Sequence, residues 1–218
     1  MTIELEEILL HHESDAMGSP STRQMKFVVI GDSSVGKTSI CKRVASNTFK
    51  SFYTQSIGVN FNTTNFVVND EKVVVQHLDI AAFEKLSGMT QQYYRGCVGA
   101  LVLFDLTSER SFEATEFWKK DVDMKCCTST QDKIPCLLVG TKCDLKEKQQ
   151  FIKTDEEFEK YAKDNNYIGF IQVSSLENIN VTTAFEKLIS YVIENNITPM
   201  DLPVSEENED TTRRWCCC

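Results

Sequence analysis

The octapeptide GDSSVGKT, from Gly31 to Thr38, constrains the fold of this chain more than any other stretch. It follows a short apolar, β-branched run at 25–31 and precedes a run of helical composition at 37–46. We therefore expect a buried parallel strand, a glycine-containing loop and a helix in direct succession. This order is typical of the opening unit of an α/β fold.

The rest of the chain continues the alternation of strands and helices. Buried strands are predicted at 98–106, 134–140 and, with a weaker pattern, 168–174. Two further strands flank Asp70-Glu71 and are expected to form a hairpin. Apolar residues recur at three- and four-residue steps in 181–192, which predicts an amphipathic helix. The alternation predicts a mostly parallel sheet with helices on both faces and ligands at the carboxyl ends of the strands.

The composition is that of an ordinary globular protein with one core. The 218 residues are 41% hydrophobic and 25% charged, and no apolar run approaches the ~18 residues of a spanning helix. The start of the chain lacks the basic and apolar regions of a signal peptide. We therefore expect the nine cysteines to be reduced. A zinc site built from Cys126, Cys127 and His11 or His12 lacks a second ligand pair with the usual spacing.

The net charge of −9 lies mainly at the two ends of the chain. Acidic residues outnumber basic ones by four in residues 1–24 and by three in residues 196–218. No basic face is visible, so we expect no nucleic-acid partner. We predict a flexible acidic extension at 1–24, one domain at 25–196 and a flexible tail at 197–218.

The glycine loop fits the phosphate-binding pattern GxxxxGK[ST], in the required place between a strand and a helix. Backbone N–H groups of such a loop and of the following helix point at phosphate oxygens. Lys37 adds a cation for the β- and γ-phosphates, and the Thr38 hydroxyl can bind magnesium. The alternative is a chance match in a surface loop, and the flanking strand and helix argue against it. The sequence therefore predicts a nucleotide site.

The choice of base rests on the segment Thr141-Lys142-Cys143-Asp144, directly after the predicted strand at 134–140. A carboxylate there can accept hydrogen bonds from the guanine N1–H and exocyclic amine, for which adenine offers no matching pair. An unpaired buried carboxylate is costly, so the discrimination should be large. A TKxD string alone is a weak signal, but its place after a buried strand favours guanine.

Several segments carry a resemblance to a known family. The order of GDSSVGKTS, SIGVNF, LDIA, YYRGC, LVLFDLT, TKCD and VSS resembles the Ras superfamily, and IGVNF, YYRG and LVLFDLT resemble its Rab branch. WKKDVDMKCC, IPCLLVGTKCDL and ENIN are similar to the Rab group of lysosome-related organelles and endosomes. The resemblance covers about residues 25–195 and the terminal cysteines.

The resemblance implies a three-layer P-loop GTPase domain, or G domain, with a six-stranded, mostly parallel sheet and helices on both faces. It implies a switch in vesicle and membrane trafficking that binds GTP or GDP with Mg²⁺. The nucleotide contacts that it implies are Ser33, Ser34, Val35, Gly36, Lys37, Thr38, Ser39, Phe49, Tyr53, Ser56, Ala82, Thr141, Lys142, Asp144, Ser174, Ser175 and Leu176. The implied magnesium ligands are Thr38, Ser56 and, through water, Asp79.

Some implied base and metal contacts differ mildly from the family pattern. Phe49 would stack against the guanine, and Ser56 replaces a threonine while keeping its hydroxyl. Thr141 replaces the commoner asparagine and Leu176 the usual lysine. Both changes are expected to weaken base packing without removing the main selector, Asp144.

The largest departure concerns the family sequence DxAGQE, which here reads Asp79-Ile-Ala-Ala82-Phe83-Glu. Ala82 replaces the glycine that senses the γ-phosphate and acts as a hinge, and alanine reaches fewer backbone angles. Phe83 replaces the glutamine that orients the attacking water, and a phenyl ring cannot make that hydrogen bond. We expect GTP and Mg²⁺ to bind but hydrolysis to be slow, unless a partner or another residue supplies the missing group.

Two other functions stay open. One is a membrane scaffold that remains mainly GTP-bound, a pseudo-GTPase, which Phe83 favours. The other is an ATP-using phosphotransferase, against which Asp144 argues.

The carboxyl end, RRWCCC, resembles the Rab signal for double geranylgeranylation, here on Cys217 and Cys218, with Cys216 as a third candidate. One lipid chain gives only marginal membrane binding, and this acidic tail offers no basic patch to assist it. Two prenyl groups are therefore the physical requirement. The expected location is the cytoplasmic face of intracellular membranes, endosomal or lysosome-related, with a cytosolic pool.

By resemblance, the partners are effectors, an exchange factor, a GDP-dissociation inhibitor and a Rab escort protein, and the chain is expected to be a monomer. Effector contacts are expected at Ile57, Phe61, Leu78 and Tyr94, with Leu78 standing where tryptophan is usual. These apolar residues could instead be core.

Overall fold

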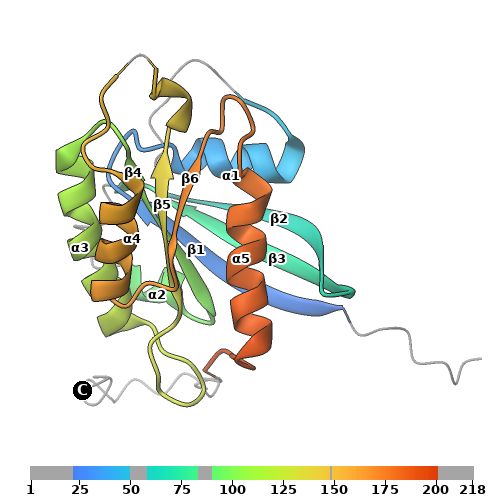
Figure 1. Ribbon diagram of the computed structural model, residues 1–218. Helices are drawn as coiled ribbons and strands as arrows, with labels where there is room; N and C mark the ends of the chain where they lie inside the picture. The colour runs from blue at the N-terminus through green and yellow to red at the C-terminus, as the bar shows by residue number, and fades with distance from the viewer. Residues whose placement is uncertain (1–21, 50–57, 83–89, 148, 201–218) are drawn as a thin grey trace, which may run out of the picture.

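The computed structural model describes residues 22–49, 58–82, 90–147 and 149–200, which form a sheet with helices on both sides (Figure 1). The strands are β1 Arg23–Gly31, β2 Val59–Val68, β3 Glu71–Ile80, β4 Gly99–Asp105, β5 Cys136–Thr141 and β6 Phe170–Val173. The helices are α1 Lys37–Ser46, α2 Thr90–Tyr94, α3 Glu109–Lys125, the 3₁₀ turn η2 Cys143–Leu145, α4 Asp155–Asp164 and α5 Val181–Glu194. The predicted α/β class is confirmed.

The sheet has the strand order β2-β3-β1-β4-β5-β6. All neighbouring strands run parallel except β2, which is antiparallel to β3. The predicted hairpin is confirmed, but its turn consists of Asn69 and Asp70, whose φ angles are 51° and 62°. Asn and Asp tolerate this left-handed region, which two-residue hairpin turns require, so Glu71 already belongs to β3.

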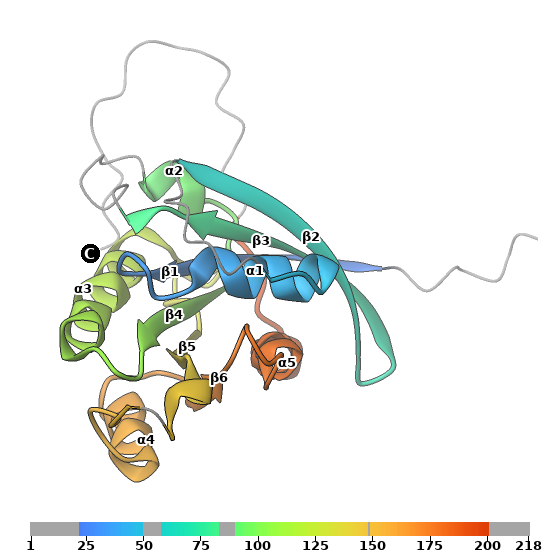
Figure 2. The ribbon, with the colours of Figure 1, turned by 90° about the horizontal axis from the view of Figure 1, so that it is seen from above.

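Alternation along the strands divides the apolar residues between two cores. In β1, Phe27 and Val29 face the core beneath α1 and α5, whereas Val28 and Ile30 face the core beneath α3 and α4. Figure 2 shows α3 and α4 on one side of the sheet and α5 on the other. This period of two in a strand buried on both faces explains why its sequence is a continuous apolar run.

Local sequence rules account for features of α5, α4 and α1. The α5 residues that are buried are those of the predicted stripe, namely Val181, Ala184, Phe185, Leu188, Ile189 and Val192. Helix α4 begins with a capping box, in which the Thr154 hydroxyl and the Glu157 side chain each bond the other residue's backbone N–H. Helix α1 occupies the predicted range, 37–46.

The predicted domain boundaries need correction at both ends. Strand β1 begins at Arg23, which pairs with Val73 of β3, so residues 23 and 24 belong to the sheet. At the other end, Pro199 forms a bridge with Thr128, and the Ser129 N–H donates to the Thr198 carbonyl at 3.1 Å. The described structure therefore continues to residue 200, and the rest of both predicted extensions lies outside the described residues.

Two further findings concern the cysteines and the membrane. The six cysteines within the described ranges are free thiols, and Cys126 is buried with its thiol against the Tyr94 and Cys97 carbonyls. His11 and His12, the other members of the zinc alternative, lie outside the described residues. In the described part of the chain, no helix has the length and apolar character needed to cross a bilayer.

Candidate nucleotide site

The parallel strands bring several predicted site residues, together with Gly31 and Asp105, to one edge of the sheet. Gly31 ends β1, Asp105 ends β4 and Thr141 ends β5, while Asp79 is the second-last residue of β3 and Ser174 directly follows β6. These ends lie near α1 and η2, at the upper edge of the sheet in Figure 1. The carboxyl edge of a parallel sheet is where ligands bind in open α/β folds.

The glycine loop has a backbone that side chains would disrupt. Gly31 has φ of +147°, and a Cβ there would lie 2.3 Å from the Leu103 carbonyl oxygen of β4. Gly36 has φ of +98° and serves as the N-cap of α1, with no side-chain oxygen capping the helix within the described ranges. An anion placed at this point would face the N–H groups of the first helical turn.

Lys37 is held inside this loop. Only 7% of the residue is exposed, and its Nζ donates to the carbonyls of Gly31 at 2.9 Å and Asp32 at 2.8 Å. Burial lowers the pKa of Lys37 to about 8, although the charges of Asp79 and Asp32 act to raise it. A buried ammonium with carbonyl partners gains strongly from a nearby polyphosphate.

The residues for a divalent cation adjoin the loop. The Thr38 hydroxyl donates to Asp79 Oδ2 at 2.6 Å, and Asn60 Nδ2 donates to the same oxygen at 3.3 Å. Asp79 is fully buried, and within the described residues its Oδ1 has no hydrogen-bond partner. A buried, unpaired carboxylate oxygen is costly unless a cation or ordered water satisfies it. Oxygen ligands of this kind fit Mg²⁺.

The end of the site that is predicted to select the base is built from the loops after β5 and β6. Asp144 lies in η2, and the Ser174 hydroxyl donates to its Oδ1 at 2.5 Å. Ser174 in turn accepts the Glu177 N–H at 3.1 Å, which fixes the hydroxyl. The carboxylate is thus oriented by a group on a neighbouring loop, as recognition of two adjacent N–H groups requires.

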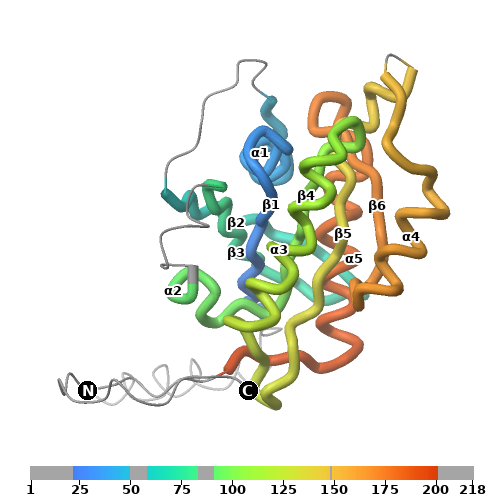
Figure 3. The backbone as a smooth tube through the Cα atoms, turned by 90° about the vertical axis from the view of Figure 1, so that its left-hand side faces the viewer, coloured from blue at the N-terminus to red at the C-terminus, as the bar shows by residue number. Residues whose placement is uncertain are grey.

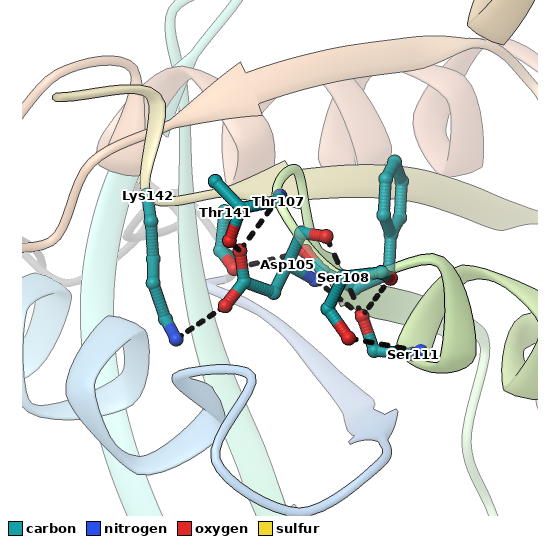
Figure 4. Close-up of polar contacts among 7 residues, drawn as sticks. Asp105, Thr107, Ser108, Ser111, Thr141 and Lys142 are labelled. Carbon is teal, nitrogen blue, oxygen red and sulfur yellow. Dashed lines mark hydrogen bonds and ion pairs between the residues drawn. The ribbon is translucent and has the colours of Figure 1, made fainter. Parts of the chain in front are cut away.

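Lys142 is oriented by a residue that the sequence patterns did not single out (Figure 4). Its Nζ pairs with Asp105 Oδ2 at 2.5 Å, and Asp105 Oδ1 accepts the N–H and hydroxyl of Thr107. Burial alone would raise the pKa of Asp105, but the hydrogen bonds from Lys142 and Thr107 hold the pKa below its ordinary value. The sequence signal that could have identified Asp105 is its position at the carboxyl end of a predicted buried strand.

The nucleotide contact expected of Thr141 stays a prediction, and the structure gives its hydroxyl a partner within the sheet. Its hydroxyl donates to the Phe104 carbonyl at 2.8 Å, so this side chain joins β5 to β4. Leu176 is 53% exposed, and Phe49 is half-buried three residues beyond α1. Ala82 is also half-buried and follows Ala81, whose N–H donates to the Gly58 carbonyl at 3.0 Å.

Other predicted residues cannot be placed. Those outside the described residues are Tyr53, Ser56, Ile57, Phe83 and the three terminal cysteines, Cys216, Cys217 and Cys218. Their roles stay predictions.

The expected effector surface is corrected. Phe61 on β2 is 59% exposed, but Leu78 opposite it on β3 and Tyr94 on α2 have no exposed area. Leu78 points into the core beneath α3 and α4, and the Tyr94 hydroxyl donates to buried Asp121 at 2.8 Å. Figure 3 shows α2 below α1 in that view. Leu78 and Tyr94 are thus core residues, and Phe61 alone of these three presents a surface.

Comparisons with known proteins agree with this geometry. The family model described as Ras family matches residues 26–194. Ras-related protein Rab-32A of Dictyostelium discoideum is 42% identical over 176 residues, which cover 79% of each chain. Ras-related protein Rab-32 of Sus scrofa is 36% identical over 88% of this chain and 83% of its own. Ras-related protein Rab-7L1 of Homo sapiens is 30% identical over 88% of this chain and 96% of its own.

Proposed function

Since the chain belongs to the Ras family and Rab proteins are among its relatives, we propose that it is a Rab-like molecular switch in membrane trafficking. In this role it binds GTP or GDP with Mg²⁺ and recruits effectors at a membrane surface. The observation that carries the proposal is that one sheet edge combines a phosphate loop around buried Lys37 with a carboxylate, Asp144, suited to guanine. Neither the phosphate loop nor Asp144 alone would select a guanine nucleotide.

The phosphate end acts through charge and preorganised N–H groups. The loop and the first turn of α1 offer N–H donors to the β-phosphate, and Lys37 moves from loop carbonyls to phosphate oxygens at little cost. Thr38 and Asp79 would hold Mg²⁺, which when bound neutralises charge between the β- and γ-phosphates. Asp79 Oδ1, which has no hydrogen-bond partner among the described residues, is the oxygen that such an ion or its water would satisfy.

The base end acts through hydrogen-bond matching. Asp144 accepts from the guanine N1–H and amine, while Ser174 keeps its carboxylate in place. The Asp105–Lys142 pair fixes the lysine stem that flanks the base, because Asp105 is itself held by Thr107. Adenine would leave the Asp144 carboxylate without a donor and bring an acceptor against it.

Hydrolysis is proposed to be slow. Ala82 and Phe83 replace the glycine and glutamine that usually sense the γ-phosphate and orient the attacking water. The same two residues favour a second candidate, a mainly GTP-bound scaffold that changes state by nucleotide exchange. The nucleotide that accompanies freshly purified protein separates the two, since mostly GTP favours the scaffold and mostly GDP favours the cycling switch.

Attachment to membranes is proposed to occur through two geranylgeranyl groups on Cys217 and Cys218, with Cys216 as a third candidate. An endosomal or lysosome-related membrane, an escort protein, a dissociation inhibitor and an exchange factor belong to the same proposal. The acidic segment 201–218 supplies no basic patch, so the lipids carry the membrane affinity.

Calorimetry tests the core of the proposal. GDP and a non-hydrolysable GTP analogue, titrated into nucleotide-free protein, should bind with an affinity that falls sharply when EDTA replaces Mg²⁺, and ADP should bind far more weakly. Equal affinity for ADP, or no heat with either guanine nucleotide, would contradict it.

A further inference from the structure

Arg43, in the last turn of α1, reaches across to the loop that lies beside Asp144. Its Nε donates to the Ser175 carbonyl at 2.7 Å, and its Nη2 donates to the Leu176 carbonyl at 3.0 Å. The two acceptors are adjacent in the chain, so the planar guanidinium binds the loop at two points. These contacts join residues more than 130 positions apart in sequence.

The third nitrogen of the guanidinium, Nη1, is held by the end of its own helix. Nη1 donates to the carbonyl of Asn47 at 3.0 Å and to its side-chain oxygen at 3.2 Å. Asn47 is the C-cap of α1 in the left-handed conformation, and its N–H returns to the Arg43 carbonyl at 2.9 Å. The guanidinium carbon also lies 5.8 Å from the centre of the Phe49 ring, within cation–π range.

Among the described residues, the partners of the Arg43 guanidinium are neutral oxygens and one aromatic ring. In the part of the chain that the structure describes, no carboxylate forms an ion pair with Arg43; its donors are directed to neutral oxygens. Those oxygens belong to the loop whose Ser174 orients Asp144 and to the turn that precedes Phe49. Arg43 thus connects the two segments that would enclose the guanine.

We propose that Arg43 is a positioning residue for the guanine base and controls how fast the nucleotide is released. The inference rests on the proposed function, because it concerns the same site. Arg43 acts at the base end: it holds the 174–176 loop and Phe49 at the separation that fits a purine. The side-chain hydrogen bonds that Arg43 forms within the described ranges go to neither the phosphate loop nor the Thr38–Asp79 pair. Loss of the two-point contact should let the loop move away and weaken the Asp144 contact with the guanine amine.

The test compares release rates of fluorescently labelled GDP and IDP, since inosine lacks the exocyclic amine that Asp144 reads. The Arg43→Gln protein should release GDP at least about tenfold faster, because the two hydrogen bonds that the charged guanidinium donates to the loop carbonyls are lost. The wild type should release IDP faster than GDP, and in the variant the ratio of these two rates should fall towards one. The factor by which EDTA accelerates GDP release should stay at its wild-type value. Arg43→Lys keeps the charge but not the planar fork and should behave similarly.

Lys42→Gln is the matched control, since Lys42 is exposed on the same helix and the substitution removes the same charge. It should leave all three quantities unchanged. Wild-type release rates in both Arg43 variants would overturn the proposal. Loss of the EDTA effect together with a lowered melting temperature would also overturn it, because that result would show general damage to the domain. If the wild-type protein itself retains no guanine nucleotide, the proposed function fails instead.

Discussion

The Thr38 hydroxyl lies 2.6 Å from Oδ2 of buried Asp79 and joins the first turn of α1 to the carboxyl end of β3. Both oxygens belong to the predicted magnesium site, and Asp79 Oδ1 has no hydrogen-bond partner among the described residues. A Thr38→Val substitution keeps the shape of the side chain but removes one metal ligand. We expect it to speed GDP release by roughly tenfold or more and to abolish most of the further acceleration by EDTA.

The measurement for Thr38 is the release rate of labelled GDP with Mg²⁺ and with EDTA. Thr38→Ser keeps the hydroxyl and serves as the control, with a near wild-type response to chelation. A Thr38→Val protein that still responds to EDTA like the wild type would show that the hydroxyl is not a metal ligand.

Proton uptake should accompany nucleotide binding at alkaline pH. Burial lowers the pKa of Lys37 to about 8 in the free protein, and polyphosphate beside it must raise that pKa. Well below pH 8 the ammonium is already charged, so binding takes up almost no proton there. Above pH 8 it must gain one, and the affinity should fall by up to about tenfold per pH unit.

Calorimetry at pH 8.5 in two buffers of different ionisation enthalpy measures this uptake. The observed binding heats should differ for the wild type and agree for Lys37→Met, which binds more weakly and has no proton to gain. Identical heats in the two buffers for the wild type would mean that Lys37 does not titrate on binding.

The strand ends and the phosphate loop were predictable from sequence because local rules determine them. The motif around Gly36 sets the loop and the start of α1, and the stripe of α5 sets its buried face. The pairing of Lys142 with Asp105 was not predictable, since it depends on β5 lying beside β4. The misplacement of Leu78 has a similar cause, because only the sheet register reveals which face of β3 is covered.

The contacts of Arg43 are even harder to predict from the sequence. The arginine looks like an ordinary charged residue on a helix, and its partners are backbone carbonyls, which carry no residue-specific signal. The turn at Asn69-Asp70 shows the same limit on a small scale: the hairpin was correctly predicted, but its turn lies one residue earlier than expected.

Restoring the two altered switch residues should restore hydrolysis. We expect Phe83→Gln to raise the single-turnover GTP hydrolysis rate, because it returns a group that can orient water. The double variant Ala82→Gly with Phe83→Gln should be faster again, since glycine also returns the hinge. Phe83→Leu, which adds no hydrogen-bonding group, is the control and should stay slow. A wild-type rate typical of Rab proteins, with no gain in the variants, would contradict the account.

Membrane attachment should require two lipids. Replacing Cys217 and Cys218 with serine should move the protein from the membrane pellet to the soluble fraction of cells, because a single remaining chain on Cys216 binds only marginally. Cys216→Ser should stay in the pellet. Persistence of the double variant on membranes would show that another feature provides the anchor.

Base selection by Asp144 tests the central claim most directly. Affinities for GDP and XDP should be measured by calorimetry with Mg²⁺ for the wild type and for Asp144→Asn, since xanthine presents an oxygen where guanine presents its amine. The account predicts that the wild type strongly prefers GDP and that the variant loses GDP affinity by about a hundredfold or more while gaining affinity for XDP. Unchanged GDP affinity in Asp144→Asn would contradict the assignment of this pocket to guanine.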